Sequence, residues 1–536
     1  MLTLACWLAK PGFRAHAFWA KTKIERHGVG QGELMDLSNW IERNADFRPG
    51  KVALHFEGRT ITYAELDGRI KRLARVLKHQ LGVGRGDRVA HIGYNSPEIV
   101  DLLFACARLG AMLVPLNWRL APPELLYIVQ NCSASVVLAE EEFRPAIDSV
   151  RNEIGDCRFV GYGGGEGWLD YDDLLVKADG DDANPHVTGD TPFLVVYTSG
   201  TTGRPKGAVL TQDAISWNAV NSTHMFDLTS ADIILTYLPM FHVGGLNIQT
   251  TPALHAGATV VLQSRFDPGA ALAAVGEHKP THFVSVPATA QAMAEHPDWA
   301  ATDFSSVKQM ITGSTMVPLP VIRKYLEKGV AVGQIYGSSE TAPIAIVLLG
   351  EDGERKIGST GKPALHCEAR IVDADGRDLP PGEPGEILIR GPNVLIEYWG
   401  NEEATNEALR DGWYYSGDIG YRDEDGFYYV VDRKKDMIIS GSENIYPAEL
   451  EAVLAECPEI VESAVVARPN EKWGEVAVAV VVRKDGGDLT REQVLALYEN
   501  TLARFKHPRD VVFVDALPRN AMGKILKFEI RDMVKD

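Results

Sequence analysis

The chain has little cysteine: there are six in 536 residues, and no two of them form a C-x-x-C pair. Disulfide-stapled modules and zinc knuckles both require closely spaced cysteines, so neither is expected. Scattered thiols are typical of a reducing compartment, which predicts a cytoplasmic protein.

Long apolar runs are also missing. The longest candidate, residues 99–118, is interrupted by Asp101 and Arg108, which predicts a buried helix that leads into a strand rather than a transmembrane segment. The apolar residues 2–9 are too short to span a membrane and follow no basic segment, so a signal peptide is not expected. Residues 1–34 are treated as an N-terminal extension, and the sequence leaves open whether they belong to the functional protein.

Basic residues are in deficit. Lysine and arginine total 54 against 73 aspartates and glutamates, which gives a net charge of −19. This field disfavours nucleic acid and anionic membranes as partners, and any anionic ligand needs local donors. The length exceeds what one hydrophobic core usually supports, so we expect a large domain and a smaller one.

Strand-like and helix-like segments alternate between residues 50 and 140, a pattern that favours βαβ units and a largely parallel sheet. The glycine- and aspartate-rich residues 161–190 predict a surface connection. A second unit begins after the charged run 432–436, where Pro447 suits the first turn of a helix and residues 476–482 predict a buried strand. The predicted fold is α/β, with an extension (1–34), a large body of βα-rich subdomains (35–432) and a small mobile cap on a hinge (433–536).

The most informative segment is residues 197–207, with the sequence YTSGTTGRPKG. Its glycines allow tight turns that aim backbone N–H groups at a ligand, while its hydroxyls and Lys206 add donors and positive charge. These features predict a polyphosphate cradle. The segment is not a Walker A loop, because a proline precedes Lys206 and a strand-like segment follows, so we expect it to join two strands.

This segment resembles the Y-T-S-G-T-T-G-x-P-K-G signature of the adenylate-forming superfamily of acyl-CoA synthetases, firefly luciferases and peptide-synthetase adenylation domains. Further segments in the same order resemble that family's motifs: PMFH (239–242), YGSSE (336–340), YSGD (415–418), DRKKDMI (432–438), SGSENIYP (440–447) and PRNAMGK (518–524). The resemblance extends from about residue 36 to the C-terminus and is strongest to the fatty-acid and aryl-acid CoA ligases.

The resemblance implies two half-reactions. The acid attacks the α-phosphorus of ATP and releases pyrophosphate, and a thiolate then attacks the acyl adenylate and releases AMP. Chemistry of this kind depends on positioning and charge neutralisation. ATP, Mg²⁺ and coenzyme A are the implied cosubstrates and metal, and a carboxylic acid is the implied substrate. A homodimer is left open.

The resemblance also implies roles for individual residues. The catalytic residues are Lys524, which bridges the carboxylate and the α-phosphate, together with His242, Thr198 and Glu340; Thr198 and Glu340 contact the metal. ATP or AMP binding falls to Thr198, Ser199, Gly200, Thr201, Thr202, Gly203, Lys206, Ser314, Tyr336, Gly337, Ser339, Asp418 and Arg433. Among these, Tyr336 is expected to stack on adenine and Asp418 to accept the ribose hydroxyls. Lys435 is the implied hinge, Gly441 and Ser442 line the CoA path, and His242, Gly313 and Gly337 line the acyl pocket.

Some positions depart from the family pattern. The usual G-G-A-P is GSTM at 313–316, Ile335 replaces a glycine, and Ser442 replaces the second glycine of S-G-G-E-N. Acetate-specific enzymes carry a tryptophan at the position of Gly337, so a glycine here predicts an open pocket and a larger acid. A medium-to-long-chain fatty acid is the first choice and a cinnamate-type aryl acid the second. Transfer to a carrier protein, a luciferase-like oxygenase and a catalytically silent binding protein remain alternatives.

Overall fold

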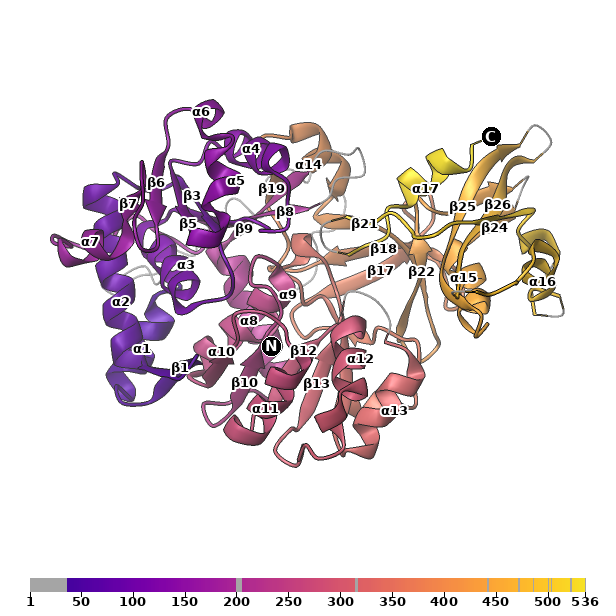
Figure 1. Ribbon diagram of the computed structural model, residues 1–536, viewed down its shortest axis with the longest axis horizontal. Coiled ribbons are helices and arrows are strands. Elements are labelled where there is room, and N and C mark those ends of the chain that lie inside the picture. The colour runs from indigo at the N-terminus through magenta and orange to yellow at the C-terminus, as the bar shows by residue number, and fades with distance from the viewer. Residues whose placement is uncertain are drawn as a thin grey trace, which may run out of the picture.

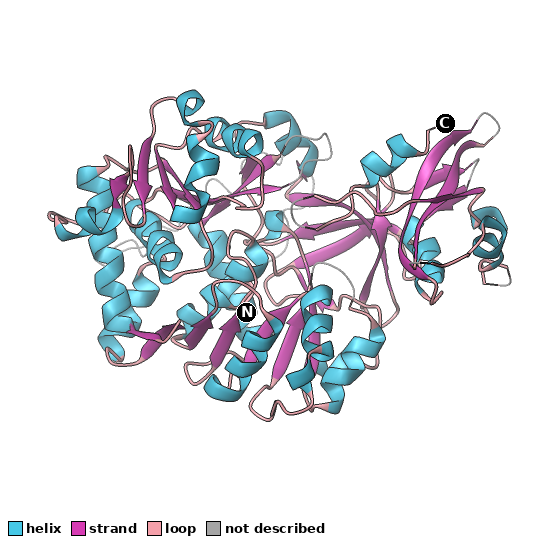
Figure 2. Cartoon of the chain, viewed as in Figure 1, coloured by secondary structure: helices cyan, strands magenta, loops and turns pink. Residues whose placement is uncertain are grey.

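The structure is a computed structural model, and it describes residues 36–198, 205–313, 317–440, 443–470, 473–484, 486–499, 501–502, 504–520 and 523–535. Two α/β lobes form the left part of Figure 1, with strands β3 to β9 in the upper lobe and β10 to β13 in the lower one. A strand-rich segment, which includes β17, β18, β21 and β22, leads to a separate C-terminal unit at the right. Figure 2 shows that sheets form the centre of each lobe and that helices cover them.

The upper lobe contains an eight-stranded sheet in the order β19-β9-β8-β4-β3-β5-β6-β7. Its strands are β3 (Arg88–Ile92), β4 (Met112–Pro115), β5 (Val136–Ala139), β6 (Arg158–Gly161), β7 (Leu169–Asp170), β8 (Pro192–Thr198), β9 (Lys206–Thr211) and β19 (Glu397–Tyr398). The strands β4, β3, β5 and β6 are parallel neighbours. The predicted alternation of strands and helices is therefore confirmed, and the buried Val89, Val114 and Val137 show why these strands are nearly continuous apolar runs.

The lower lobe contains a nine-stranded sheet in the order β16-β15-β14-β13-β12-β10-β11-β1-β2. Its strands are β1 (Val52–Phe56), β2 (Arg59–Thr62), β10 (Ile233–Thr236), β11 (Thr259–Leu262), β12 (His282–Ser285), β13 (Gln309–Thr312), β14 (Ala331–Tyr336), β15 (Ile346–Leu348) and β16 (Lys362–Pro363). Strands β10, β12, β13 and β14 are parallel, so their carboxyl ends lie along one edge. One continuous hydrophobic core joins the two lobes.

Helices cover both sheets, and their ends follow local sequence signals. The helices of the two lobes are α1 (Asn39–Phe47), α2 (Tyr63–Arg75), α3 (Pro97–Leu109), α4 (Pro122–Asn131), α5 (Arg144–Asp148), α6 (Arg151–Ile154), α7 (Tyr171–Val176), α8 (Gln212–Met225), α9 (Val243–Asn247), α10 (Thr250–Ala256), α11 (Pro268–His278), α12 (Pro287–Glu295) and α13 (Leu319–Glu327). A capping box of Thr62 and Glu65 starts α2, and Pro97 starts α3. Gly110, with φ of +69°, ends α3 in the left-handed conformation that glycine favours.

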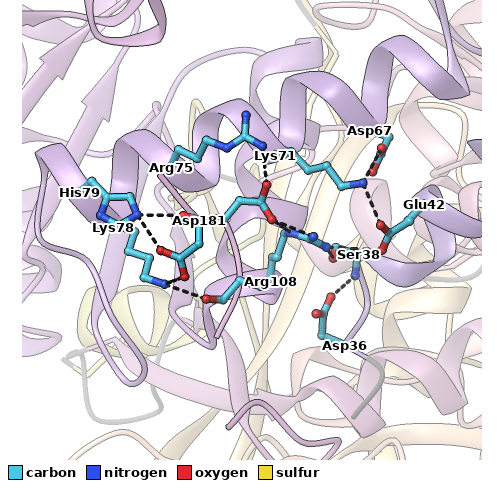
Figure 3. Close-up of polar contacts among 12 residues, drawn as sticks. Asp36, Ser38, Glu42, Asp67, Lys71, Arg75, Lys78, His79, Arg108 and Asp181 are labelled. Carbon is cyan, nitrogen blue, oxygen red and sulfur yellow. Dashed lines mark hydrogen bonds and ion pairs between the residues drawn. The ribbon is translucent and has the colours of Figure 1, made fainter. Parts of the chain in front are cut away.

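The segment 161–190 is more ordered than a surface connection. It contains β7 and α7, and its acidic end is attached to the helical body (Figure 3). Asp182 accepts from Arg75 and Arg108 at 2.8 Å each, and Asp181 pairs with Lys78. The sequence-based prediction of a plain loop missed these elements because glycine and aspartate dominate the composition, while the ion pairs involve residues 74 to 107 positions earlier.

A third, five-stranded sheet follows the two lobes: β17 (Glu368–Val372), β18 (Gly385–Arg390), β20 (Leu409–Arg410), β21 (Trp413–Arg422) and β22 (Tyr428–Arg433), with α14 (Glu402–Ala408) beside it. Strand β22 pairs antiparallel with β21 and brings Arg433 opposite Asp418. The segment between Arg433 and Ile438 connects this sheet to the C-terminal unit, so the first two residues of the predicted linker 432–436 belong to β22.

The C-terminal unit has its own five-stranded sheet and two clusters of buried side chains. Its elements are β23 (Ile438–Ser440), β24 (Glu443–Ile445), β25 (Ile460–Asn470), β26 (Gly474–Arg483), β27 (Asp510–Phe513), α15 (Pro447–Ala455), α16 (Arg491–Ala496) and α17 (Lys527–Met533). Pro447 begins α15 as predicted, and Leu450 and Leu454 are fully buried. The predicted α/β class, with a large body and a small cap, is confirmed.

The described residues contain neither a candidate membrane-spanning helix nor a disulfide bond. None of the helices that the structure describes is long and apolar enough to cross a membrane. All five described cysteines are free thiols.

Candidate active site

The predicted phosphate cradle joins two adjacent antiparallel strands. Strand β8 ends at Thr198 and β9 begins at Lys206, and the two residues are register partners. The Thr198 hydroxyl donates a long hydrogen bond of 3.4 Å to the Lys206 carbonyl oxygen. The predicted binding residues Ser199, Gly200, Thr201, Thr202 and Gly203 lie outside the described residues.

Glu340 and Lys206 both contact one tyrosine, Tyr398. Glu340 belongs to the short 3-10 turn η4 (Ser339–Thr341) and is only 7% exposed. Its Oε1 accepts a 2.8 Å hydrogen bond from the Tyr398 hydroxyl. The Lys206 ammonium lies 5.4 Å from the centre of the Tyr398 ring. The predicted metal ligand Glu340 and the cradle lysine are thus brought together, and Ser339 immediately precedes Glu340.

A second polar group surrounds Asp418, which is 8% exposed. Its Oδ2 accepts a 2.7 Å hydrogen bond from the Tyr336 hydroxyl, and its Oδ1 pairs with Arg433 Nε at 2.6 Å. Burial raises the pKa of Asp418, while Arg433 and Tyr336 act in the opposite direction. Each carboxylate oxygen keeps a further lone pair, so the carboxylate can still accept hydrogen bonds from a cis-diol.

Three predicted site segments follow parallel strands of the nine-stranded sheet. His242 lies after β10, Gly313 follows β13, and Tyr336 ends β14. Because the carboxyl ends of parallel strands meet at one edge of a sheet, these residues share that edge, where ligands of open α/β sheets bind. The remaining predicted residue of this edge, Ser314, lies outside the described residues.

Gly337 does not leave an opening. A Cβ atom on Gly337 would lie 1.6 Å from the Pro343 carbonyl oxygen, far inside any contact distance. The glycine therefore permits the close approach of two backbone segments, and the expectation that it widens the acyl pocket is corrected. Gly313 is also tightly packed, since its Cβ would lie 3.1 Å from Cγ1 of Ile335. Ile335, one of the departures from the family pattern, therefore packs close to Gly313.

His242 is the residue before α9 and is half-buried, with its ring centre 4.6 Å from that of Phe241. Burial, and secondarily the charge of Arg119, lower the pKa of His242 to about 4. The imidazole is therefore neutral at pH 7 and can donate one hydrogen bond and accept another.

Lys524 comes to the site from the C-terminal unit. It lies in a tight turn in which its N–H donates to Asn520 Oδ1 at 2.9 Å, with Gly523 at φ of +77°. The surrounding protein and the Arg433 guanidinium lower the pKa of Lys524, and the Asp418 carboxylate opposes this shift. The charges of Asp418 and Arg433 therefore both act on Lys524, although they lie far from it in sequence.

The connection that contains Lys435 is held on both sides. Lys434 donates its N–H to the Gly417 carbonyl oxygen and pairs with Glu386, which belongs to the large body. Arg531 in α17 donates to the Lys435 carbonyl oxygen at 3.2 Å and pairs with Asp436 at 2.5 Å. Lys435 is therefore the residue between these two attachments. Gly441 and Ser442, the predicted CoA-path residues, lie outside the described residues.

Sequence reasoning missed Tyr398 and Arg119. Tyr398 contacts Glu340 from a strand 58 positions later, and no spacing rule pairs these positions. Arg119 lies 4.2 Å from the Trp118 ring centre and influences His242 electrostatically. Only the folded chain brings either residue to the site.

Two protein-family models match this chain. Residues 41–399 match the model described as AMP-binding enzyme, and residues 449–524 match the AMP-binding enzyme C-terminal domain. The chain belongs to the AMP-binding enzyme family. The predicted membership of the adenylate-forming superfamily is therefore confirmed.

Curated members of the AMP-binding enzyme family match almost the whole chain. The indoleacetate–CoA ligase of Aromatoleum aromaticum is 50% identical over 93% of this chain and 98% of its own. The feruloyl-CoA synthase of an Amycolatopsis species is 43% identical over 92% and 98%. The long-chain-fatty-acid–CoA ligase FadD13 of Mycobacterium tuberculosis is 37% identical over 88% and 93%. The predicted class, an AMP-forming acid–thiol ligase, is confirmed.

Solved structures of AMP-binding enzymes agree with the fold. The Bacillus subtilis O-succinylbenzoate coenzyme A synthetase, in complex with ATP and magnesium ion, has a TM-score of 0.82 and 32% identity and covers 93% of this chain and 100% of its own. The anthranilate CoA ligase AuaEII, in complex with anthranoyl-AMP, has a TM-score of 0.85 and 27% identity over 94% and 98%. ATP, Mg²⁺ and coenzyme A are the cosubstrates and metal of this class, as predicted.

Proposed function

We propose that the chain is an aryl-acid CoA ligase and that an arylacetic acid such as indole-3-acetate is its best substrate. The observation that carries this proposal is the 50% identity, over nearly both full lengths, to the indoleacetate–CoA ligase. The feruloyl-CoA synthase at 43% identity supports an aromatic acid independently.

A fatty acid is the weaker choice. The fatty-acid ligase relative is 37% identical and is matched over a smaller part of this chain. The sequence argument from Gly337 favoured any larger acid, aliphatic or aromatic, so the Pro343 carbonyl oxygen that fills this space does not distinguish the two. The aryl-acid reading, which was the second choice from the sequence, is therefore the better supported one.

In the first half-reaction, a carboxylate oxygen of the acid forms a bond to the α-phosphorus of ATP while the bond to pyrophosphate breaks. We assign Lys524 to neutralise charge that develops on the carboxylate and the α-phosphate. Asp418 accepts the ribose hydroxyls, and Tyr336 and Arg433 hold its carboxylate in place. Lys206 and the cradle backbone bind the phosphates that leave.

The residues present fit a magnesium ion bound together with ATP. Among the described residues, no three His, Cys, Asp or Glu side chains form a metal-binding group, so the protein offers no complete cage. Mg²⁺ is usually held by one or two carboxylates plus substrate phosphates. Glu340 is a buried carboxylate with a fixed orientation, and Thr198 adds a hydroxyl. When bound, the ion would neutralise phosphate charge.

In the second half-reaction, the CoA thiolate attacks the acyl carbon of the adenylate and AMP leaves. We assign His242, as a neutral imidazole, to position the reacting carboxyl group. Rotation about Lys435 would carry Lys524 away from AMP after the first step. The cytoplasmic location and a homodimer remain predictions.

A substrate panel tests this proposal. AMP formation that depends on both ATP and CoA is measured with indole-3-acetate, phenylacetate, ferulate, octanoate and palmitate, and with a purified carrier protein in place of CoA in a parallel set. We expect kcat/KM for indole-3-acetate to exceed that for either fatty acid by about tenfold or more. A preference for octanoate or palmitate, or for the carrier over CoA, would contradict the proposal.

A further inference from the structure

Tyr398 lies where the phosphate cradle meets the predicted metal ligand. It belongs to β19, the edge strand of the eight-stranded sheet, and pairs with Ala208 of β9, two residues after Lys206. Its N–H donates to the Thr405 hydroxyl at 2.9 Å, and the side chain is 8% exposed. The main chain of Tyr398 is therefore fixed by β9 and by α14.

Two different parts of this side chain contact two charged groups. The hydroxyl donates to Glu340 Oε1 at 2.8 Å, a buried hydrogen bond to a carboxylate. The ring lies 5.4 Å from the Lys206 ammonium, within the range of a cation–π interaction. Hydrogen bonds to charged acceptors are stronger than those between neutral groups, so the orientation of Glu340 is well determined.

The two charges do not pair with each other. Across the part of the chain that the structure describes, neither Lys206 nor Glu340 forms an ion pair, although both contact Tyr398. A direct contact between them would neutralise both and occupy the groups that ATP and its metal ion need. The ammonium instead contacts the Tyr398 ring and the carboxylate contacts the Tyr398 hydroxyl, which occupies only one lone pair of Oε1.

We propose that Tyr398 is a positioning residue of the ATP site: its ring keeps Lys206 and Glu340 apart, and its hydroxyl aims Glu340 at the magnesium ion of ATP. This inference rests on the proposed function, because it takes Glu340 as the carboxylate that binds the metal. It assigns two separable roles to one side chain, and each predicts its own kinetic signature.

Removal of the hydroxyl alone tests whether the hydroxyl aims Glu340 at the magnesium ion. Y398F keeps the ring and removes the hydrogen bond to Glu340. The Mg²⁺ concentration for half-maximal adenylation should therefore rise by roughly tenfold, because loss of a residue that hydrogen-bonds a metal ligand usually lowers metal affinity by at least that factor. The KM for ATP at saturating Mg²⁺ should stay near the wild-type value. Binding of Mn²⁺ in the presence of ATP, followed by electron paramagnetic resonance, gives the same comparison without turnover.

Removal of the ring tests whether the ring keeps Lys206 and Glu340 apart. In Y398L the ammonium and the carboxylate can approach each other, so the KM for ATP should rise by about tenfold or more in addition to the change in Mg²⁺ dependence, and saturating Mg²⁺ should not restore it. The matched control is Y325F, which removes another buried tyrosine hydroxyl, one that donates to the Ala290 carbonyl oxygen at 2.9 Å away from this site. Y325F should change neither the Mg²⁺ dependence nor the KM for ATP.

The outcomes separate this inference from the proposed function. If E340Q weakens Mn²⁺ binding but Y398F binds Mn²⁺ and responds to Mg²⁺ like the wild type, the hydroxyl does not position Glu340 and the inference is wrong. If Y398L shows the same KM for ATP as Y398F, the ring does not keep Lys206 and Glu340 apart and that part of the inference is wrong. If E340Q leaves Mn²⁺ binding unchanged, the metal role of Glu340 fails, and this inference fails with it. Melting temperatures of all variants identify any loss of folding.

Discussion

The hydroxyl of Tyr336 donates a 2.7 Å hydrogen bond to the carboxylate of Asp418, although 82 positions separate the two residues. The bond joins the carboxyl end of β14 in the nine-stranded sheet to β21 in the five-stranded sheet. Arg433 holds the other oxygen of the same carboxylate. The predicted adenine-stacking residue therefore also orients the predicted ribose acceptor, which sequence motifs alone do not indicate.

The first prediction concerns this bond. Y336F keeps the aromatic face but removes one donor to a buried carboxylate, a loss of about 1.5–3 kcal/mol for a hydrogen bond to a charged group. The KM for ATP should therefore rise by about tenfold, with a smaller change in the KM for the acid. Initial-rate kinetics at varied ATP measure this. An unchanged KM for ATP would mean that Asp418 is held in place without Tyr336.

The second prediction concerns Lys524. K524A removes the charge that we place beside the carboxylate and the α-phosphate, so adenylation should slow by about a hundredfold or more. Thioester formation from a supplied aryl adenylate and CoA should proceed at nearly the wild-type rate. The matched control is K527A. Lys527 lies three positions after Lys524 and forms an ion pair with Glu451. Equal loss of both half-reactions in K524A would refute the assigned division of roles.

The third prediction concerns the pH dependence of catalysis. Burial and Arg119 lower the pKa of His242 from the ordinary 6.5 to about 4, so the neutral imidazole persists until the pH approaches 4. Thioester formation should therefore show no His242-dependent loss between pH 8 and 5.5. The wild type and H242N are compared by their pH–rate profiles. An inflection between pH 6 and 7 that H242N abolishes would contradict a depressed pKa.

The fourth prediction concerns the pH dependence of stability. His91 is 1% exposed, its Nε2 is buried without a partner among the described residues, and burial lowers its pKa to about 4. The unfolded chain binds this proton near pH 6.5, while the folded protein stays neutral to about pH 4. The contribution of His91 to stability is therefore complete above pH 6.5 and is lost as the pH falls to 4, by about 3 kcal/mol.

Chemical denaturation at pH 7 and at pH 4.5 checks this. The wild type should lose more unfolding free energy between these values than H91Q, which lacks the titrating group. H186Q, a change at an exposed histidine, should behave like the wild type. A wild-type loss equal to that of H91Q would mean that His91 is protonated to the same extent in both states.

Much of the architecture could be predicted because it depends on local patterns. The alternation of strand-like and helix-like segments between residues 50 and 140 predicted the parallel strands β3, β4 and β5 and the helices α3 and α4 between them. The segment 161–190 was misjudged because its short elements have no apolar period and are held by distant ion pairs.

The site was predictable only in part. The resemblance to the family's motifs pointed to Glu340, Asp418 and Arg433, which the fold brings into contact with further site residues. Tyr398 could not be predicted, because its contacts arise when the edge strand β19 pairs with β9. Gly337 was misread because sequence shows the absence of a side chain, whereas the structure shows the Pro343 carbonyl oxygen in the vacated space.

The most direct test of the account is the formation of an aryl adenylate without CoA. Purified protein is mixed with ATP, Mg²⁺ and indole-3-acetate, and bound indoleacetyl-AMP and released pyrophosphate are quantified in a single turnover. We predict about one equivalent of each per active site with indole-3-acetate and much less with palmitate. Pyrophosphate release that is absent with indole-3-acetate, or that palmitate supports better, would contradict the account.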